Sequence, residues 1–77
     1  MITSEKLIDI LINSGAEVDR SDISTDKSFE ELGLDSLDIF NFFTEIDAEL
    51  GIDVPDKDFE SLQSIEDVSK YLTSKGL

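Results

Sequence analysis

One serine of this chain stands in a setting that suggests chemistry. Ser36 follows Asp35 and precedes Leu37 and Asp38, where the residue pattern changes from loop to helix. A serine hydroxyl is a poor nucleophile unless a neighbouring base activates it. The chain contains no histidine and no cysteine, so it cannot build a Ser-His-acid triad by itself. Covalent chemistry at Ser36 therefore requires another enzyme, and we expect no catalytic residue and no enzymatic activity in this chain.

Helices are the elements that must position this serine. Apolar residues recur with a helical period over 4–14, 36–50 and 65–74, and a short helix is expected from Pro55 through residue 61. No segment shows the sustained alternation of a β-strand. The predicted fold class is all-α, a small four-helix bundle with a long loop between helices one and two and a short third helix. We expect one domain over residues 1–77.

The loop and the second helix each carry apolar residues with a predicted purpose. A structureless loop of about 20 residues is unusual in a compact domain, so we expect apolar side chains to pin this one to the core. These are Val18, Ile23, Phe29, Leu32 and Leu34. Helical spacing predicts the core face of the second helix as Ile39, Phe42, Phe43, Ile46 and Leu50. A second stripe, directed away from the core, consists of Leu37, Asn41, Thr44 and Ala48.

Charge limits the classes of partner. The formal net charge is −13, and 12 of the acidic residues lie between Asp26 and Glu60, with only two lysines among them. Such a field disfavours nucleic acid and anionic membranes and favours proteins with basic patches. No apolar run is long enough for a transmembrane helix, and the N-terminus lacks the pattern of a signal peptide. We therefore expect a cytoplasmic protein without a membrane span.

Two motifs carry a resemblance to a known family. The first, Phe-x-x-Leu-Gly-x-Asp-Ser-Leu-Asp, spans Phe29 to Asp38, and the second, Ile-x-Val-Pro-Asp, spans Ile52 to Asp56. Together with the acidic character and the long first loop, they resemble the acyl carrier protein family. The resemblance implies that a phosphopantetheinyl transferase attaches 4′-phosphopantetheine, donated by coenzyme A, to Ser36. It also implies a carrier that holds acyl intermediates as thioesters and delivers them to enzymes of fatty-acid, polyketide or related biosynthesis.

The same resemblance implies a partner face and an acyl cavity. We expect acyl-transferring, synthase or ligase enzymes with basic patches to contact Asp35, Leu37, Asp38, Asn41, Thr44, Asp47 and Glu49. We expect the acyl cavity and the core around it to involve Phe40, Phe43, Ile46, Phe59, Leu62, Val68, Tyr71 and Leu72. Nothing in the sequence indicates an obligate oligomer, so a monomer is expected.

Helix two departs from the family pattern. Asn41 stands where glutamate is common and Thr44 where an aliphatic residue is usual, and three phenylalanines, Phe40, Phe42 and Phe43, replace aliphatic residues. One hypothesis is a specialised carrier with a narrowed set of partners or an altered acyl cavity. The alternative is that the aromatic rings only fill core volume.

Three other functions are compatible with parts of the sequence. An aminoacyl, peptidyl or D-alanyl carrier protein shares the bundle and the modified serine, although the acidity and the Asp-Ser-Leu-Asp sequence favour the acyl type. An unmodified acidic interaction module would not need Ser36. Calcium binding is suggested by Asp53, Asp56 and Asp58, but the segment lacks the glycine and glutamate of an EF-hand loop, so no specific metal site is expected.

Overall fold

The computed structural model describes residues 2–76, and at Asp56 the backbone only. These residues form three α-helices and two 3₁₀-helices, in the order α1 (Ser4–Asn13), η1 (Arg20–Asp22), α2 (Ser36–Leu50), η2 (Asp56–Ser61) and α3 (Ile65–Ser74). Within this part of the chain there is no strand, only an isolated bridge between Ser28 and Ser64. The all-helical class is confirmed. No helix of residues 2–76 has the length and apolar character needed to cross a membrane.

Capping residues begin the α-helices at the predicted positions, and a glycine ends α2. The Thr3 hydroxyl accepts a hydrogen bond from the Lys6 N–H (3.2 Å) and begins α1, as an N-cap does. The Ser64 hydroxyl accepts one from the Asp67 N–H (3.2 Å) and begins α3. The Asp67 carboxylate accepts a hydrogen bond from the Gln63 N–H and not from the Ser64 N–H, so no reciprocal capping box forms at this helix start. Gly51 ends α2 in the left-handed region, with φ 72°.

The segment predicted as a short third helix is the 3₁₀-helix η2. Its apolar residue Phe59 and the following Leu62 are three positions apart, which is one turn of a 3₁₀-helix. Pro55 precedes it as the N-cap residue, in extended conformation. The structure thus has three α-helices where four helices were predicted, and the four-helix count is not confirmed.

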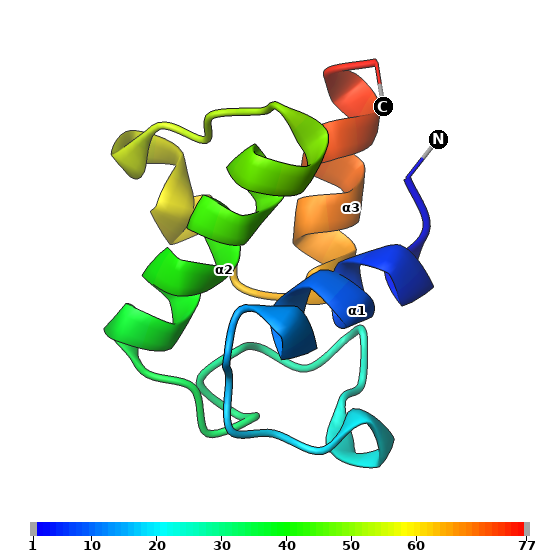
Figure 1. Ribbon diagram of the computed structural model, residues 1–77, viewed down its shortest axis with the longest axis vertical. Helices are drawn as coiled ribbons and strands as arrows, with labels where there is room; N and C mark the ends of the chain where they lie inside the picture. The colour runs from blue at the N-terminus through cyan, green and yellow to red at the C-terminus, as the bar shows by residue number, and fades with distance from the viewer. Residues whose placement is uncertain (1, 77) are drawn as a thin grey trace.

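The core lies between α1 and the other two α-helices. α1 packs against both α2 and α3, and Figure 1 shows the long connection between α1 and α2 at one end of the molecule. At the centre, Leu7, Ile10 and Leu11 of α1 are fully buried together with Phe42 of α2. The complete buried cluster is Leu7, Ile10, Leu11, Phe29, Leu34, Phe42, Phe43, Ile46, Val54, Leu62, Ile65, Val68 and Leu72.

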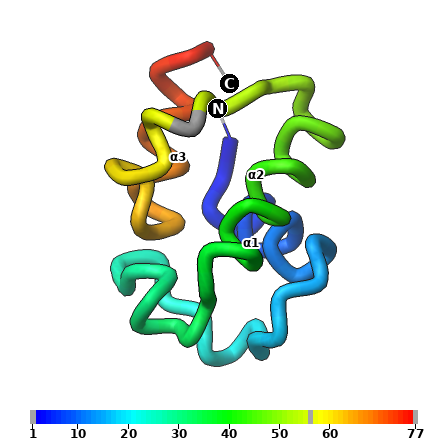
Figure 2. Tube along the Cα trace, turned by 90° about the vertical axis from the view of Figure 1, so that its left-hand side faces the viewer, coloured from blue at the N-terminus to red at the C-terminus, as the bar shows by residue number. Residues whose placement is uncertain are grey.

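The long connection between α1 and α2 is fixed to the rest of the molecule. The Phe29 N–H donates to the Gln63 carbonyl (2.6 Å), and the Glu66 N–H donates to the Thr25 carbonyl (3.0 Å). The connection passes beneath the helices, beside the start of α3 (Figure 2). All five apolar residues predicted to pin it do pack on the core: Val18, Ile23, Phe29, Leu32 and Leu34. This anchored loop delivers the chain to Asp35 and sets where α2 begins.

Candidate functional site

Ser36 is the first residue of α2, and its side chain is exposed. Asp35 precedes it as the N-cap, in extended conformation. The Asp35 carboxylate accepts a hydrogen bond from the Asp38 N–H (2.9 Å), and the Asp38 carboxylate accepts one from the Asp35 N–H (3.2 Å). This reciprocal capping box holds the backbone on both sides of the serine and presents its hydroxyl outward.

The start of α2 combines groups that favour an attached phosphate with groups that oppose it. The first N–H groups of a helix lack intrahelical partners and favour an anion such as a phosphate. The carboxylates of Asp35 and Asp38 are committed to the capping box, and their negative charge opposes a phosphate. Since the chain has no histidine or cysteine, Ser36 lacks the usual general base. The exposed hydroxyl fits a residue that another enzyme modifies.

Most of the residues predicted for partner contact lie at the start or on the exposed surface of α2. Leu37 is 65% exposed and Phe40 is 54% exposed, which leaves two large apolar side chains facing solvent. Glu49 lies 3.5 Å from the Lys6 ammonium group, and Asp38 is half-buried in its capping box. The remaining predicted members are exposed: Asp35, Asn41, Thr44 and Asp47. Phe40 was not predicted for partner contact. Of the seven residues that were, six lie at the start or on the exposed surface of α2, whereas Glu49 lies toward α1, where it pairs with Lys6.

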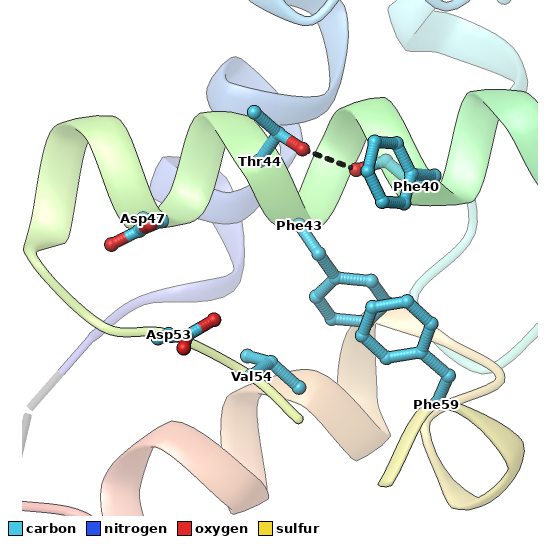
Figure 3. Close-up of a pocket in the computed structure, with 7 residues that line it drawn as sticks. All are labelled: Phe40, Phe43, Thr44, Asp47, Asp53, Val54 and Phe59. Carbon is cyan, nitrogen blue, oxygen red and sulfur yellow. Dashed lines mark hydrogen bonds between the residues drawn. The ribbon is translucent and has the colours of Figure 1, made fainter. Parts of the chain in front are cut away.

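Two hollows lie beside the segment that follows α2, one against α2 itself and the other against the end of the connection that precedes α2. The first, called here the helix hollow, has a volume of about 150 Å³ and is lined by Phe40, Phe43, Thr44, Asp47, Asp53, Val54 and Phe59. Figure 3 shows its two aspartates at the end away from the overlapping rings of Phe43 and Phe59. The second, the loop hollow, has a volume of about 190 Å³ and is lined by Ser28, Phe29, Glu30, Ile39, Phe59, Glu60, Leu62 and Gln63.

The residues predicted for the acyl cavity and core separate into three groups. Phe40, Phe43 and Phe59 line the helix hollow, while Leu62 lines the loop hollow. Phe40 is not a core residue, because its position on α2 is roughly 160° away from that of the buried Phe42. The remaining predicted members line neither hollow: Ile46, Val68 and Leu72 are buried, and Tyr71 is half-buried.

The sequence interpretation missed several residues of the hollows. Asp53 and Val54 line the helix hollow, although the sequence analysis predicted neither residue for the acyl cavity. Tyr71 also has an unforeseen partner, because its hydroxyl donates to the Asp58 carboxylate of η2 (2.9 Å). Burial raises the pKa of the Tyr71 hydroxyl, and the hydrogen bond to Asp58 raises it further. This bond ties η2 to α3.

The structure lends no support to a metal centre. Within the described residues, no group of three or more acidic, histidine or cysteine side chains is placed to hold a metal ion. Of the three aspartates considered for calcium, Asp58 bonds to Tyr71, Asp53 lines the helix hollow, and the side chain of Asp56 lies outside the described part.

Comparison with known proteins bears directly on Ser36. A family model described as "phosphopantetheine attachment site" matches residues 7–72. An acyl carrier protein of Bdellovibrio bacteriovorus is 35% identical over 77 residues, covering 99% of this chain and 97% of that protein. Acyl carrier proteins of Rickettsia massiliae and Rickettsia felis are each 37% identical over 79 residues, covering 97% of this chain and 92% of theirs. The chain belongs to the acyl carrier protein family.

Membership explains the chemistry that this chain lacks. An acyl carrier protein is a carrier and not an enzyme, and its cofactor is 4′-phosphopantetheine, whose terminal thiol holds an acyl group as a thioester. The arm thus supplies the sulfur that a cysteine-free chain does not contain. An exposed serine beside the free N–H groups of a helix fits the phosphodiester end of such an arm.

Proposed function

We propose that Ser36 carries the 4′-phosphopantetheine arm of this acyl carrier protein. The observation that supports this most strongly is its place: it is exposed, at the first position of α2, and inside the matched region. The donor is coenzyme A and the catalyst a phosphopantetheinyl transferase, because the chain has no histidine to activate the hydroxyl itself. The whole chain, residues 1–77, then acts as one carrier domain, with η2 standing in place of the short third helix of a four-helix bundle.

Intact-mass measurement tests this assignment. The purified protein is incubated with coenzyme A and a broad-specificity transferase, and a mass gain of one phosphopantetheine is expected. Ser36→Ala should show none. Ser21→Ala is the matched control, since Ser21 is also exposed but lies in η1, and it should be modified normally. A full mass gain in Ser36→Ala would overturn the assignment.

The outer side of α2 is the proposed docking face for partner enzymes. Leu37 stands directly beside Ser36 and is the most exposed large apolar side chain described. Asp47 is exposed and has no ion pair among residues 2–76. Charges of this kind steer encounter with basic patches and are screened by salt. Asp35, Asp38, Asn41, Thr44 and Glu49 complete this face.

Asp35 and Asp38 need a test that separates charge from capping. Asp35→Asn retains the oxygen that accepts the Asp38 N–H and removes the charge, whereas Asp35→Ala removes both. If the charge serves docking, Asp35→Asn should raise the KM of the transferase several-fold at low salt, and the difference from wild type should fade as salt rises. A KM equal to that of wild type at low salt would contradict the docking role of this carboxylate.

The pathway remains a proposal from the family. Partner enzymes of fatty-acid, polyketide or related biosynthesis, acting on a cytoplasmic monomer, are the expected users of the acyl thioester. Two exposed residues, Asn41 and Thr44, and the solvent-facing ring of Phe40 change the chemistry of the docking face. These differences support a specialised carrier. Elongation of the loaded protein by housekeeping fatty-acid synthase enzymes, at the rate of their own carrier, would contradict that specialisation.

A further inference from the structure

The two hollows share a single side chain. Phe59 lines both the helix hollow and the loop hollow, and no other described residue does so. The remaining walls differ, because Ile39 and Leu62 face the loop hollow while Phe43 and Val54 face the helix hollow. Phe59 therefore stands between two spaces that would otherwise run together along α2.

The ring of Phe59 ends a row of aromatic side chains. Phe29 meets Phe42 edge to face (5.6 Å between centroids, 70°), and Phe42 is tilted against Phe43 (5.4 Å). Phe43 and Phe59 are stacked, with centroids 4.5 Å apart and planes at 15° (Figure 3). Phe29, Phe42 and Phe43 are at most 4% exposed, whereas Phe59 is half-buried. Phe59 is thus the member of the row with room to move.

Its backbone also belongs to the less strongly bonded part of the fold. Phe59 lies in η2, and 3₁₀-helices have poorer hydrogen-bond geometry than α-helices. The hydrogen bond from the Tyr71 hydroxyl holds the neighbouring Asp58, and not the Phe59 ring, to α3. Because Phe59 belongs to η2, its ring can leave the stack with Phe43 without unfolding of any α-helix.

We infer that Phe59 is a partition that sets the length of the acyl chain which this protein shelters. The inference rests on the proposed attachment at Ser36. Both hollows are partly open to solvent, and each has at least the volume of a cavity that admits one benzene ring, about 150 Å³, which gives room for about six carbon atoms. Along the axis of α2, Ile39 lies about 4.5 Å from Ser36, Phe43 about 10 Å and Asp47 about 16 Å. A chain that enters from the serine end meets the loop hollow first and then the Phe59 ring.

Charge limits what lies beyond the partition. Asp47 and Asp53 line the far end of the helix hollow, Glu30 and Glu60 line part of the loop hollow, and all four are exposed. Apolar carbons gain little beside carboxylates that keep their water. The sheltered track should therefore consist of the apolar part of the loop hollow, along Ile39, Phe29 and Leu62, and, once Phe59 is displaced, the apolar part of the helix hollow. Short saturated acyl groups are the cargo that fits with the partition in place.

Thermal unfolding of a series of loaded proteins tests this inference. Butyryl, hexanoyl, octanoyl and decanoyl arms are attached from the corresponding acyl coenzymes A, and each Tm is compared with that of the unacylated arm. Each methylene that becomes buried should raise Tm by about 3–6 °C. For wild type, the rise should level off near hexanoyl. For Phe59→Ala, it should continue through octanoyl and decanoyl.

Further variants keep the test decisive. Phe59→Leu serves if the alanine variant does not fold, and Phe59→Trp should move the plateau to shorter chains. Ile8→Ala is the matched control, because Ile8 is half-buried on α1 and lines neither hollow. It should lower every Tm equally and leave the plateau in place.

The outcomes separate this inference from the proposed attachment. Intact mass is measured first, and a protein that accepts no arm contradicts the role of Ser36. An arm that is accepted, with a plateau at the same chain length in wild type and all Phe59 variants, overturns the role of Phe59 alone. A plateau that moves outward for alanine or leucine and inward for tryptophan establishes it.

Discussion

The side of the molecule that faces α1 and the side that faces η2 differ sharply in packing, although α2 contributes to both. On the α1 side, Leu7, Ile10, Leu11 and Phe42 are fully buried. On the η2 side, the Phe59 ring is half-buried and lies between two hollows. One face of α2 is therefore fully packed against the core, whereas another face borders unfilled hollows.

This division matches two different requirements. A chain of 77 residues has little core to spare, so its stability depends on the few side chains that are completely buried. Shelter for an acyl group needs the opposite, namely apolar surface that is not already filled. The third face of α2, on which Leu37 is 65% exposed, serves neither purpose and remains available to partner enzymes.

The largest effect should come from the α1 side. Phe42→Ala removes a ring that is 0% exposed and packs edge to face on Phe29, so the free energy of unfolding should fall by about 3–5 kcal/mol. Phe59→Ala removes a ring of equal size from the η2 side and should lower the free energy of unfolding by less than half as much. Urea unfolding of both variants measures the difference. Equal losses would abolish the distinction between the two sides.

A smaller effect is expected at the tether of η2. Tyr71→Phe deletes the hydrogen bond to Asp58, so the free energy of unfolding should fall by about 1 kcal/mol. Relative to wild type, amide exchange should accelerate more in η2 than in α1. Retention of wild-type stability and exchange would show that this bond does not hold η2.

The same tyrosine should contribute a dependence on pH. Because the folded protein raises the pKa of Tyr71 above that of the unfolded chain, its contribution to stability is complete below the unfolded pKa, near 10. It is lost as pH rises through the folded pKa. Tyr71 is the only tyrosine, so tyrosinate absorbance reports this group alone. A midpoint at or below that of unfolded protein would contradict the shift.

The smallest change in stability is expected on the outer face. Leu37→Ala removes a side chain that is 65% exposed, and the free energy of unfolding should change by less than about 0.5 kcal/mol. The same variant should slow transfer of phosphopantetheine, if Leu37 contacts the transferase. Reduced stability with an unchanged rate would instead place Leu37 in the structural framework.

Much of the fold could be read from local signals. Thr3, Asp35 and Ser64 act as N-caps where the sequence pattern predicted helix starts, and Gly51 ends α2. These signals act within a few residues, so a single sequence contains them. The buried face of α2 followed from helical spacing in the same way. The spacing also left Phe40 off that face, and the structure places this residue in the wall of the helix hollow instead of the core.

The site was less predictable where it depends on contacts between distant segments. The hollows are lined by residues 53–63 together with α2 and, for the loop hollow, residues 28–30, and nothing local to any of these segments specifies the spaces between them. The bond from Tyr71 to Asp58 likewise joins residues 13 positions apart. Ser36 could be singled out because its motif is contiguous, whereas the surfaces that would receive its cargo are assembled only on folding.

Nuclear Overhauser contacts from an isotope-labelled hexanoyl group loaded on the protein test the account most directly. The account predicts contacts from the acyl chain to the rings of Phe59 and Phe43 and to Ile39, with none to Leu7 or Ile10 of α1. Contacts to α1, or a loaded chain that touches no residue between α2 and η2, would contradict the claim that the η2 side shelters the cargo of Ser36.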